Sequence, residues 1–428
     1  MGFRRHPALR PREIGILLAI AMGALAVIGA LLAADVRISA QVSGGGDFYS
    51  LWAGSRAYLL QQSSPYSVEV AGLAQSLAYG RNAAAGENPF LLTIPLFLFP
   101  LFFPFGFASA PAIARGVWLC LSQAALVGSI SVSLSLVEWK PPRLLALLIG
   151  CLGVFGFYTV SAFLAGTPTV MLTLLYTGTL WALRNERDEL AGALMVLSLF
   201  MWEVGGVFLV LIALRVFHQR RWGVLAGLAM TLALLLGVSF LLDSRWILPF
   251  LTSVVGQMRS VYGASTASVL TELSPRYGAL IARSTTVLVL IVVIYEWWSG
   301  RDGDFKRFVW LACLALAITP LLGLRSEVNN LVVLGPSIVV ICAASVRRGR
   351  FGALLGLIIL ITAFLVPWLL VSGWLVIDAQ TRYGYLFLFY PLLGVAGLYW
   401  TRWWFLRPRR TWLDEVRAGG HGVSGHTP

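Results

Sequence analysis

One carboxylate in the sequence stands where a catalytic base could be held at the end of an apolar segment. Three glycines, Gly44 to Gly46, lead directly into Asp47, and an aromatic-rich segment follows as far as Tyr66. Glycines allow the backbone a tight turn, and an acid at the start of an amphipathic helix is a favourable N-cap. The same position suits a general base that accepts a proton from an attacking hydroxyl. Asp47 is therefore either a helix cap or a catalytic residue, and its position alone does not decide between the two.

Other catalytic chemistries lack the residues that they need. The sequence has no nucleophile elbow, P-loop, dinucleotide-binding fingerprint or cluster at metal-ligand spacing. The acids that follow Asp47 in the same segment, Glu69 and Glu87, do not stand at ligand spacing from it. We therefore expect no metal and no cofactor. All four histidines fall in segments predicted to be cytoplasmic: His6, His218, His421 and His426.

Glu203 is a second candidate, because it lies inside the apolar run 190–214 beside Trp202. An ionisable residue within a membrane helix indicates function by default. The alternative is a structural carboxyl that pairs with a neighbouring helix or stays neutral through burial. Both interpretations remain open, and we include Glu203 among the substrate-binding candidates.

Arginines on the same side of the membrane as Asp47 are candidates for binding a lipid-linked phosphate. A guanidinium binds phosphate through two parallel hydrogen bonds. Most surface arginines are instead solvated or lie along apolar surface. From this group we assign donor phosphate binding to Arg259, Arg276 and Arg325.

The elements that must position these residues are membrane helices. Of the 428 residues, 58% are hydrophobic and only 12% are charged, which is typical of a polytopic membrane protein. Backbone groups in hydrocarbon must bond internally and the alternating pattern of barrel strands is missing, so the fold is predicted to be all-α. We expect one domain over residues 1–428 with twelve spans, near 14–34, 90–104, 112–137, 144–164, 168–183, 190–214, 223–243, 281–298, 308–324, 331–346, 351–374 and 383–400.

The distribution of basic residues predicts the orientation. With a cytoplasmic N-terminus and twelve crossings, the cytoplasmic side holds 19 of the 32 Lys and Arg, Arg115 among them, and only 6 acids. Both termini and the tail 401–428 are therefore predicted to be cytoplasmic, in a multi-pass protein of the cell membrane. Because topology explains the basic balance, no nucleic acid is expected as a partner.

Two predicted outer loops are much longer than the other connections, 35–89 and 244–280. Loops of this length in a compact protein are usually functional. Both contain amphipathic patterns, Phe48, Leu51, Trp52, Ser55, Tyr58 and Leu59 in the first, and Trp246, Ile247, Phe250 and Leu251 in the second. We expect both helices to lie in the membrane interface, with tryptophan and tyrosine at headgroup depth.

The segment "GGGDFYSLWAGSRAYLLQQSSPY", residues 44–66, resembles the first-loop signature of the bacterial polyprenyl-phosphate-mannose-dependent mannosyltransferases, glycosyltransferase family 87 of the GT-C superfamily. The stretch "NPFLLTIPLFLFPLFFPF", residues 88–105, is similar to the region that follows in this family, and the likeness continues to about residue 345. The chain departs from the family pattern at Gly166-Thr167, at Trp202-Glu203 and at a proline pair reduced to Ile94-Pro95.

The resemblance implies a GT-C-type bundle with two long amphipathic outer loops and a catalytic Asp47. It also implies an inverting transfer of a sugar, mannose in the named relatives, from a polyprenyl phosphate to a lipid or glycan acceptor, among membrane lipids. In the matching segment we assign substrate binding to Tyr49, Trp52, Arg56 and Tyr66. The main alternative is a transporter or flippase of a lipid-linked sugar, although no repeat relates the two halves. A membrane scaffold without activity would not need Asp47.

Overall fold

The computed structural model describes residues 11–260, 262–374 and 376–406 of the chain. Within these ranges the fold is helical, with 18 α-helices, three 3-10 helices and a single β-bridge between Ala264 and Ser326. Seven of these helices are long and apolar enough to span a bilayer, or up to nine spans if each of two bent helix pairs counts as one. The prediction of an all-α polytopic membrane protein is confirmed. Residues 407–428 of the predicted tail lie outside the described residues.

The helices form two compact units, and each is described here by itself. Unit 1 comprises Met1–Gly128, Tyr158–Leu174 and Leu232–Tyr262. It contains the beginnings of α5 (Pro111–Leu136) and α8 (Thr169–Arg184) and the end of α11 (Trp222–Leu242). The other helices of unit 1 are α1 (Pro11–Gln41), α2 (Gly46–Gln61), α3 (Val68–Tyr79), η1 (Leu96–Phe102), α4 (Phe103–Gly106), α7 (Phe157–Ala165) and α12 (Ile247–Arg259).

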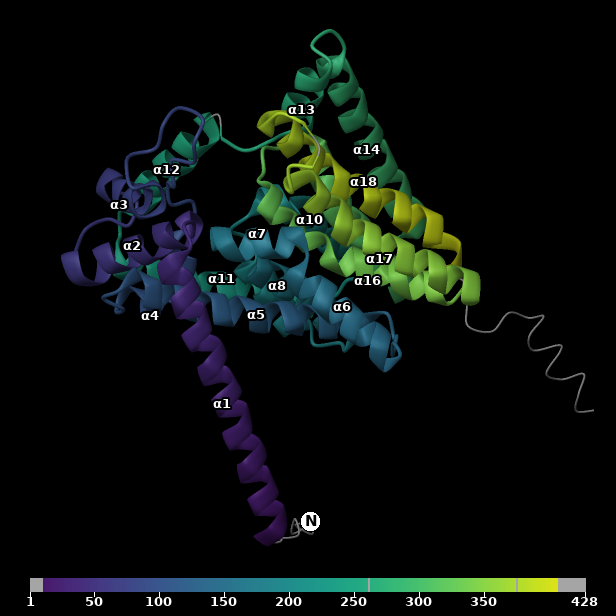
Figure 1. Ribbon diagram of the computed structural model, residues 1–428, viewed down its shortest axis with the longest axis horizontal. Helices are drawn as coiled ribbons and strands as arrows, with labels where there is room; N and C mark the ends of the chain where they lie inside the picture. Colours follow the sequence, from purple (N-terminus) through teal and green to yellow (C-terminus); the bar gives the residue numbers. More distant parts are fainter. Residues whose placement is uncertain (1–10, 261, 375, 407–428) are drawn as a thin grey trace, which may run out of the picture. The chain divides into compact units, whose positions relative to one another are not determined.

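Unit 2 comprises Ser129–Phe157, Leu175–Thr231 and Gly263–Pro428. Besides the remaining parts of α5, α8 and α11, its helices are α6 (Arg143–Phe155), α9 (Asp188–Leu197), α10 (Trp202–His218), α13 (Thr266–Leu273), α14 (Gly278–Gly300), α15 (Phe305–Ile318), η2 (Thr319–Leu322), η3 (Val328–Leu334), α16 (Gly335–Val346), α17 (Arg350–Val371) and α18 (Ala379–Leu406). In this unit α16 packs against both α17 and α18 (Figure 1).

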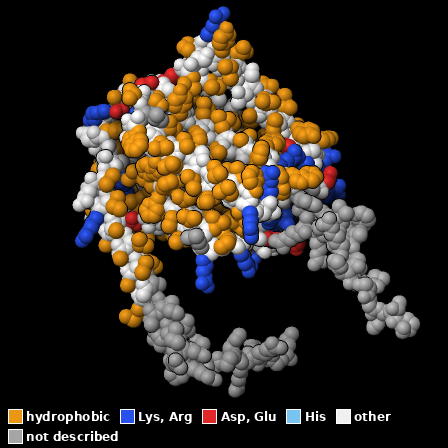
Figure 2. All heavy atoms as spheres, turned by 45° about the vertical axis from the view of Figure 1, so that its right-hand side comes forward, with side chains coloured by type: hydrophobic (Ala, Val, Ile, Leu, Met, Phe, Trp, Pro, Cys, Tyr) orange, Lys and Arg blue, Asp and Glu red, His pale blue; other side chains and the backbone are white. Residues whose placement is uncertain are grey.

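Burial separates central from peripheral helices in unit 2. Nearly every residue of α15 and α16 is buried, whereas few residues of the strongly apolar helices α14 and α17 are buried. Hydrophobic side chains also cover much of the face seen in Figure 2. An exposed apolar surface of this extent is what a protein presents to lipid.

The first span ends in a sharp turn that sets the direction of the candidate site. Helix α1 runs for 31 residues to Gln41, and α2 then begins at Gly46. The two helix axes differ by 98° across this short break (Figure 1). The glycines at 44–46 supply the tight turn that the sequence predicts at this place.

The predicted span 90–104 does not cross the membrane. Its prolines interrupt helix formation, and the segment forms only η1 and the four-residue α4. At the start of α5, the Arg115 Nη1 donates a hydrogen bond of 2.8 Å to the carbonyl oxygen of Val42, just past the end of α1. A crossing between these two points would separate them by the thickness of the bilayer. The prediction that places Arg115 on the opposite side from Asp47 is therefore wrong.

The predicted span 190–214 is also not a single crossing. It is divided into α9 and α10, with non-helical residues at Leu199 to Met201. Arg221, just after α10, pairs with Asp188 at the start of α9, and its Nη1 donates to the carbonyl oxygen of Leu183 at 3.0 Å. The 17 residues of α10 would extend about 25 Å away if they continued the direction of α9. The two helices therefore form a hairpin that returns to its starting side.

Candidate active site

Asp47 lies in the first turn of α2 but does not cap it. The N-cap residue is Gly45, in the left-handed region at φ 82°, and no side chain caps the helix there. The interpretation of Asp47 as the N-cap is therefore wrong. A carboxylate in a first helical turn is favoured by the helix dipole. Asp47 is partly exposed, whereas its neighbours Gly46 and Phe48 are buried, so its carboxylate is the accessible group at this helix start.

A buried arginine fixes the turn on one side of Asp47. Arg115 is fully buried, and besides its bond to Val42 its Nη2 donates to the carbonyl oxygen of Leu164 at 2.9 Å. The same carbonyl accepts the backbone N–H of Gly45 at 2.7 Å. Its guanidinium fills the space beside Gly45, where an added Cβ would lie 2.6 Å from Nε. The end of α1, the end of α7 and the start of α5 are thereby joined behind Asp47.

A buried asparagine contacts Asp47 from the other side. The Asn88 Nδ2 donates to Asp47 Oδ1 at 3.4 Å, and Asn88 is only 4% exposed. Its Oδ1 accepts the backbone N–H of Phe90 at 3.0 Å and the Nε2 of Gln257, on α12, at 3.2 Å. Sequence reasoning missed Asn88 and Gln257. Asn88 is the first residue of the proline-rich stretch 88–105, but its side chain is neutral, so an inspection of charged residues does not identify it.

Two of the predicted substrate residues are buried on α2. Tyr49 is 6% exposed and lies beneath the Arg115 guanidinium, 5.8 Å from ring centroid to Cζ. Trp52 is 5% exposed, and its Nε1 donates to the carbonyl oxygen of Ala108 at 3.1 Å. Ten residues of α2 are buried, Trp52 among them, so the expectation that the Trp52 side chain contacts lipid headgroups is wrong. Its apolar residues pack within unit 1.

The other two predicted substrate residues of this loop also contact the protein. The Arg56 Nη1 lies 3.5 Å from the carbonyl oxygens of Gly106 and Ala108. The Tyr66 hydroxyl donates to the carbonyl oxygen of Ile94 at 2.8 Å. Both side chains tie the α2 region to the folded-back segment 94–108, and their assignment to substrate stays a prediction.

Helix α12 packs against this site with one face and exposes the other. The Ser253 Oγ donates to the carbonyl oxygen of Leu92 at 2.7 Å, and Trp246 is only 4% exposed among aromatic neighbours. The expectation of an interfacial Trp246 is therefore wrong. The exposed apolar stripe of α12 keeps Ile247 and Leu251 from the predicted pattern and adds Leu248, Val255 and Met258.

The predicted phosphate-binding arginines are divided between the units. Arg259 is exposed and ends α12 in unit 1, two residues after Gln257. Arg276 and Arg325 are exposed and belong to unit 2, where the Arg276 guanidinium lies 5.1 Å from the ring centroid of Tyr277. Of the three, Arg259 is the one that shares a unit with Asp47.

Glu203 lies at the beginning of α10, where the α9–α10 hairpin turns, and not in the middle of a helix. It is near enough to Tyr176 and Glu327 for electrostatic interaction with both. Tyr176 is fully buried, and its hydroxyl fills the space beside Gly205, where the backbone of α10 departs from helical geometry. Glu203, Tyr176 and Glu327 all belong to unit 2.

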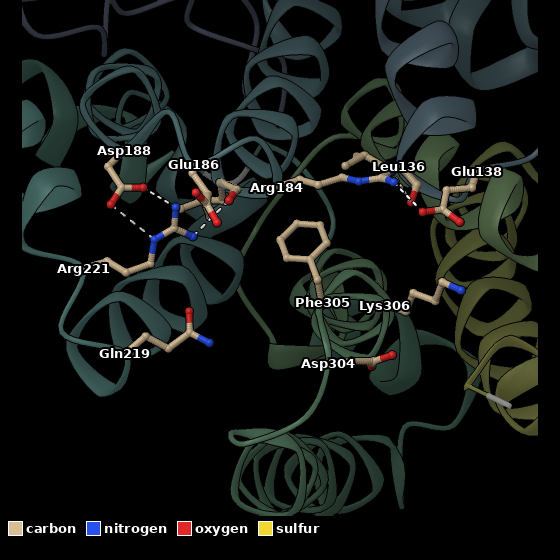
Figure 3. A pocket seen from close by; sticks show the side chains of 11 residues that line it. Leu136, Glu138, Arg184, Glu186, Asp188, Gln219, Arg221, Asp304, Phe305 and Lys306 are labelled. Carbon is tan, nitrogen blue, oxygen red and sulfur yellow. Dashed lines mark hydrogen bonds and ion pairs between the residues drawn. The ribbon is translucent and has the colours of Figure 1, made fainter. Parts of the chain in front are cut away.

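A separate cavity of about 820 Å³ in unit 2 is lined by charged side chains (Figure 3). Arg221 pairs there with Asp188, and Arg184 pairs with Glu138. None of the predicted site residues lines this cavity. Among the described residues, no group of three or more His, Cys, Asp or Glu could hold a metal ion.

Comparison with known families now identifies the chain. The model of glycosyltransferase family 87 matches residues 92–320, which is more than half of the chain and includes the folded-back segment 94–108. No curated protein and no solved structure matches. The matched region starts after Asp47 and does not include that residue. The chain belongs to glycosyltransferase family 87.

Proposed function

We propose that the protein is an inverting hexosyltransferase of GT-C type, which moves mannose from a polyprenyl-phosphate donor to a lipid or glycan acceptor at the outer membrane face. Membership of glycosyltransferase family 87 supports glycosyl transfer. The likeness of residues 44–66 to the mannosyltransferases supports mannose and the polyprenyl donor. The observation that carries the proposal is Asp47, which is partly exposed, contacted by Asn88 and placed between buried residues at the start of α2.

The proposed reaction needs one base and no general acid. The acceptor oxygen attacks the anomeric carbon and forms a new C–O bond, while the bond from that carbon to the phosphate oxygen breaks on the opposite face. The electron pair leaves with the polyprenyl phosphate, and the hydroxyl proton passes to the Asp47 carboxylate. A single displacement inverts the configuration, so a β-linked donor gives an α-mannoside.

Asp47 is suited to this role by its surroundings. The packed turn formed with Arg115 and Leu164 holds the α2 terminus in place, so little reorganisation is needed when the base acts. The donor phosphate needs a cation that the buried Arg115 guanidinium, already bonded to carbonyl oxygens, is poorly placed to supply. We therefore keep the exposed Arg259, Arg276 and Arg325 for this role.

The test is transfer by the purified, reconstituted protein from synthetic polyprenyl-phosphate mannose to a panel of lipid acceptors. We expect Asp47→Asn to lose transfer by about 10²-fold or more while it keeps its melting temperature and donor binding. The matched control is Glu69→Gln, because Glu69 is also an acid in the first turn of a helix of the same loop. Normal transfer by Asp47→Asn would remove the proposed base. Intact donor moved between leaflets, without transfer, would indicate the flippase instead.

A further inference from the structure

We infer that Asn88 is a positioning residue for the reaction proposed above: its side-chain amide, oriented by Phe90 and Gln257, fixes the Asp47 carboxylate and favours its ionised form. This inference rests on the proposed role of Asp47 as the base. It adds two residues that carry no charge and that lie 41 and 210 positions further along the chain.

The direction of the hydrogen bonds follows from a backbone group. The N–H of Phe90 can only donate, so the Asn88 atom that faces it at 3.0 Å must be the oxygen Oδ1. The amide nitrogen Nδ2 of Asn88 then faces Asp47 Oδ1. For the same reason Gln257 must present its own nitrogen to Asn88 Oδ1. The donor that reaches Asp47 is thus fixed by the backbone and not by a choice of side-chain orientation.

The backbone around Asn88 is fixed as well. The Tyr79 hydroxyl lies between the backbone groups of Asn88, 3.2 Å from its N–H and 3.4 Å from its carbonyl oxygen. The Tyr79 ring stacks on Phe90 at 5.2 Å, and Phe90 has a positive φ of 47°. The Phe90 ring also occupies the position where a Cβ on Gly46 would lie, 2.0 Å from its Cζ. Asn88 and the start of α2 are therefore packed as one body.

An N–H that donates to a carboxylate oxygen stabilises the charged form, and this effect is larger in a buried site than in water. Replacement of Asn88 by Asp reverses it, since two adjacent carboxyls cannot both ionise freely. Charged or titratable groups that contact this turn or the segment of Asn88 are Arg115 of α5, Tyr49 of α2 and Tyr79 of α3. Arg259, two residues after Gln257, and the pair Arg81–Glu87, beside Asn88 in the sequence, are exposed.

Glu87 does not titrate in the pH range in which the pH–rate profile is measured. The hydrogen bond from Arg81 lowers the pKa of Glu87 to about 2, so this neighbour of Asn88 stays ionised across the working range of an enzyme. Guanidinium groups do not lose their charge in proteins. A shift in the acidic limb of the pH–rate profile then reflects the ionisation of Asp47 and, in the Asn88→Asp variant, of the new carboxyl at position 88.

The experiment compares pH–rate profiles of the reconstituted wild type and four variants. Asn88→Asp should move the acidic limb up by about one pH unit and recover activity at high pH. Asn88→Ala should lower kcat about tenfold and leave the KM for donor unchanged. Gln257→Glu places an acceptor against Asn88 Oδ1 and should also lower kcat. The control is Gln75→Ala, which loosens the same loop through Pro89 and Ala83 but should leave the acidic limb unmoved.

Each outcome decides between the inference and the proposed function. An unchanged pH profile and kcat in Asn88→Asp would overturn the positioning role, and so would a Gln75→Ala profile shifted as far as that of Asn88→Asp. If Asn88→Asp does not fold, normal kcat in Gln257→Glu and Asn88→Ala would overturn it instead. Full transfer by Asp47→Asn would refute the proposed base. In the Asp47→Asn background, Asn88→Asp should cause no further change, because the group that Asn88 positions is already gone.

Discussion

The guanidinium of Arg115 donates to the carbonyl oxygen of Val42 at 2.8 Å and so joins the beginning of α5 to the end of α1. Val42 and Arg115 lie 73 positions apart, and the segment between them includes a run apolar enough to be predicted as a span. That run folds back within unit 1 instead. Arg115 therefore belongs to the side of Asp47, where its charge stabilises carbonyl groups at a helix end.

This contact predicts that residues 105–111 and the loop around Asn82 lie on the same side of the membrane. A membrane-impermeant thiol reagent should label Ser109→Cys and Asn82→Cys alike, since both positions are exposed. The four native cysteines are first replaced: Cys120, Cys151, Cys313 and Cys342. His6→Cys, in the segment predicted to be cytoplasmic, serves as the protected control. Protection of Ser109→Cys together with His6→Cys would restore the crossing at 90–104.

Gly46 should tolerate no side chain. An added Cβ would lie 2.0 Å from the Phe90 Cζ, so Phe90 must move and the Asn88 contact to Asp47 moves with it. We expect Gly46→Ala to lower stability by about 1–3 kcal/mol, as overpacking does, and to reduce transfer.

Gly72→Ala provides the control for Gly46→Ala, because Gly72 lies inside α3 with nothing near its Cβ position. That variant should be neutral or slightly more stable. The measurement is the melting temperature of the reconstituted proteins. Equal melting temperatures for the two variants would contradict the close packing of Phe90 on the start of α2.

Short sequence patterns predicted those features of the site that depend on residues adjacent in the chain. The glycines and Asp47 predicted a tight turn and a helix start, and hydropathy predicted spans such as α14 and α17, which mostly face outward. Hydropathy does not distinguish an apolar run that crosses from one that folds back, which is why 90–104 and 190–214 were assigned wrongly. The contacts from Gln257 to Asn88 and from Asn88 to Asp47 depend on tertiary packing between distant segments, which no local pattern in one sequence reveals.

The loop that carries Asn88 should be held by an ion pair that is lost in acid. Both Nη atoms of Arg81 bind the Glu87 carboxylate at 2.7 Å, and the Ala84 N–H donates to it as well. The pKa of Glu87 is lowered to about 2, chiefly by the Arg81 hydrogen bond, from an ordinary value of 4.5. Because the pKa is lower in the folded state, this contribution to stability is complete above pH 4.5 and disappears as the pH falls toward 2.

Glu87→Gln tests this pair directly. The variant should melt slightly below the wild type at pH 6, and the difference should shrink steadily as the pH falls below 4.5. A difference that stays constant with pH would mean that the pair does not hold the loop. Activity of this variant at neutral pH also shows how much the loop contributes to the placement of Asn88.

The donor phosphate should be bound by one or more of the exposed arginines Arg259, Arg276 and Arg325. A charge-assisted hydrogen bond to phosphate contributes about 1.5–3 kcal/mol, so loss of the right arginine should raise the KM for donor at least tenfold. If the contact is equally strong in the ground and transition states, kcat stays unchanged.

The test replaces each of these arginines by Gln, which removes the charge but keeps a hydrogen-bonding side chain. Arg245→Gln is the control, since Arg245 is also exposed and lies near α12. Arg259 shares unit 1 with Asp47, whereas Arg276 and Arg325 belong to unit 2. Donor titrations of the three variants separate these cases, and an unchanged donor KM in all three would show that the phosphate is bound elsewhere.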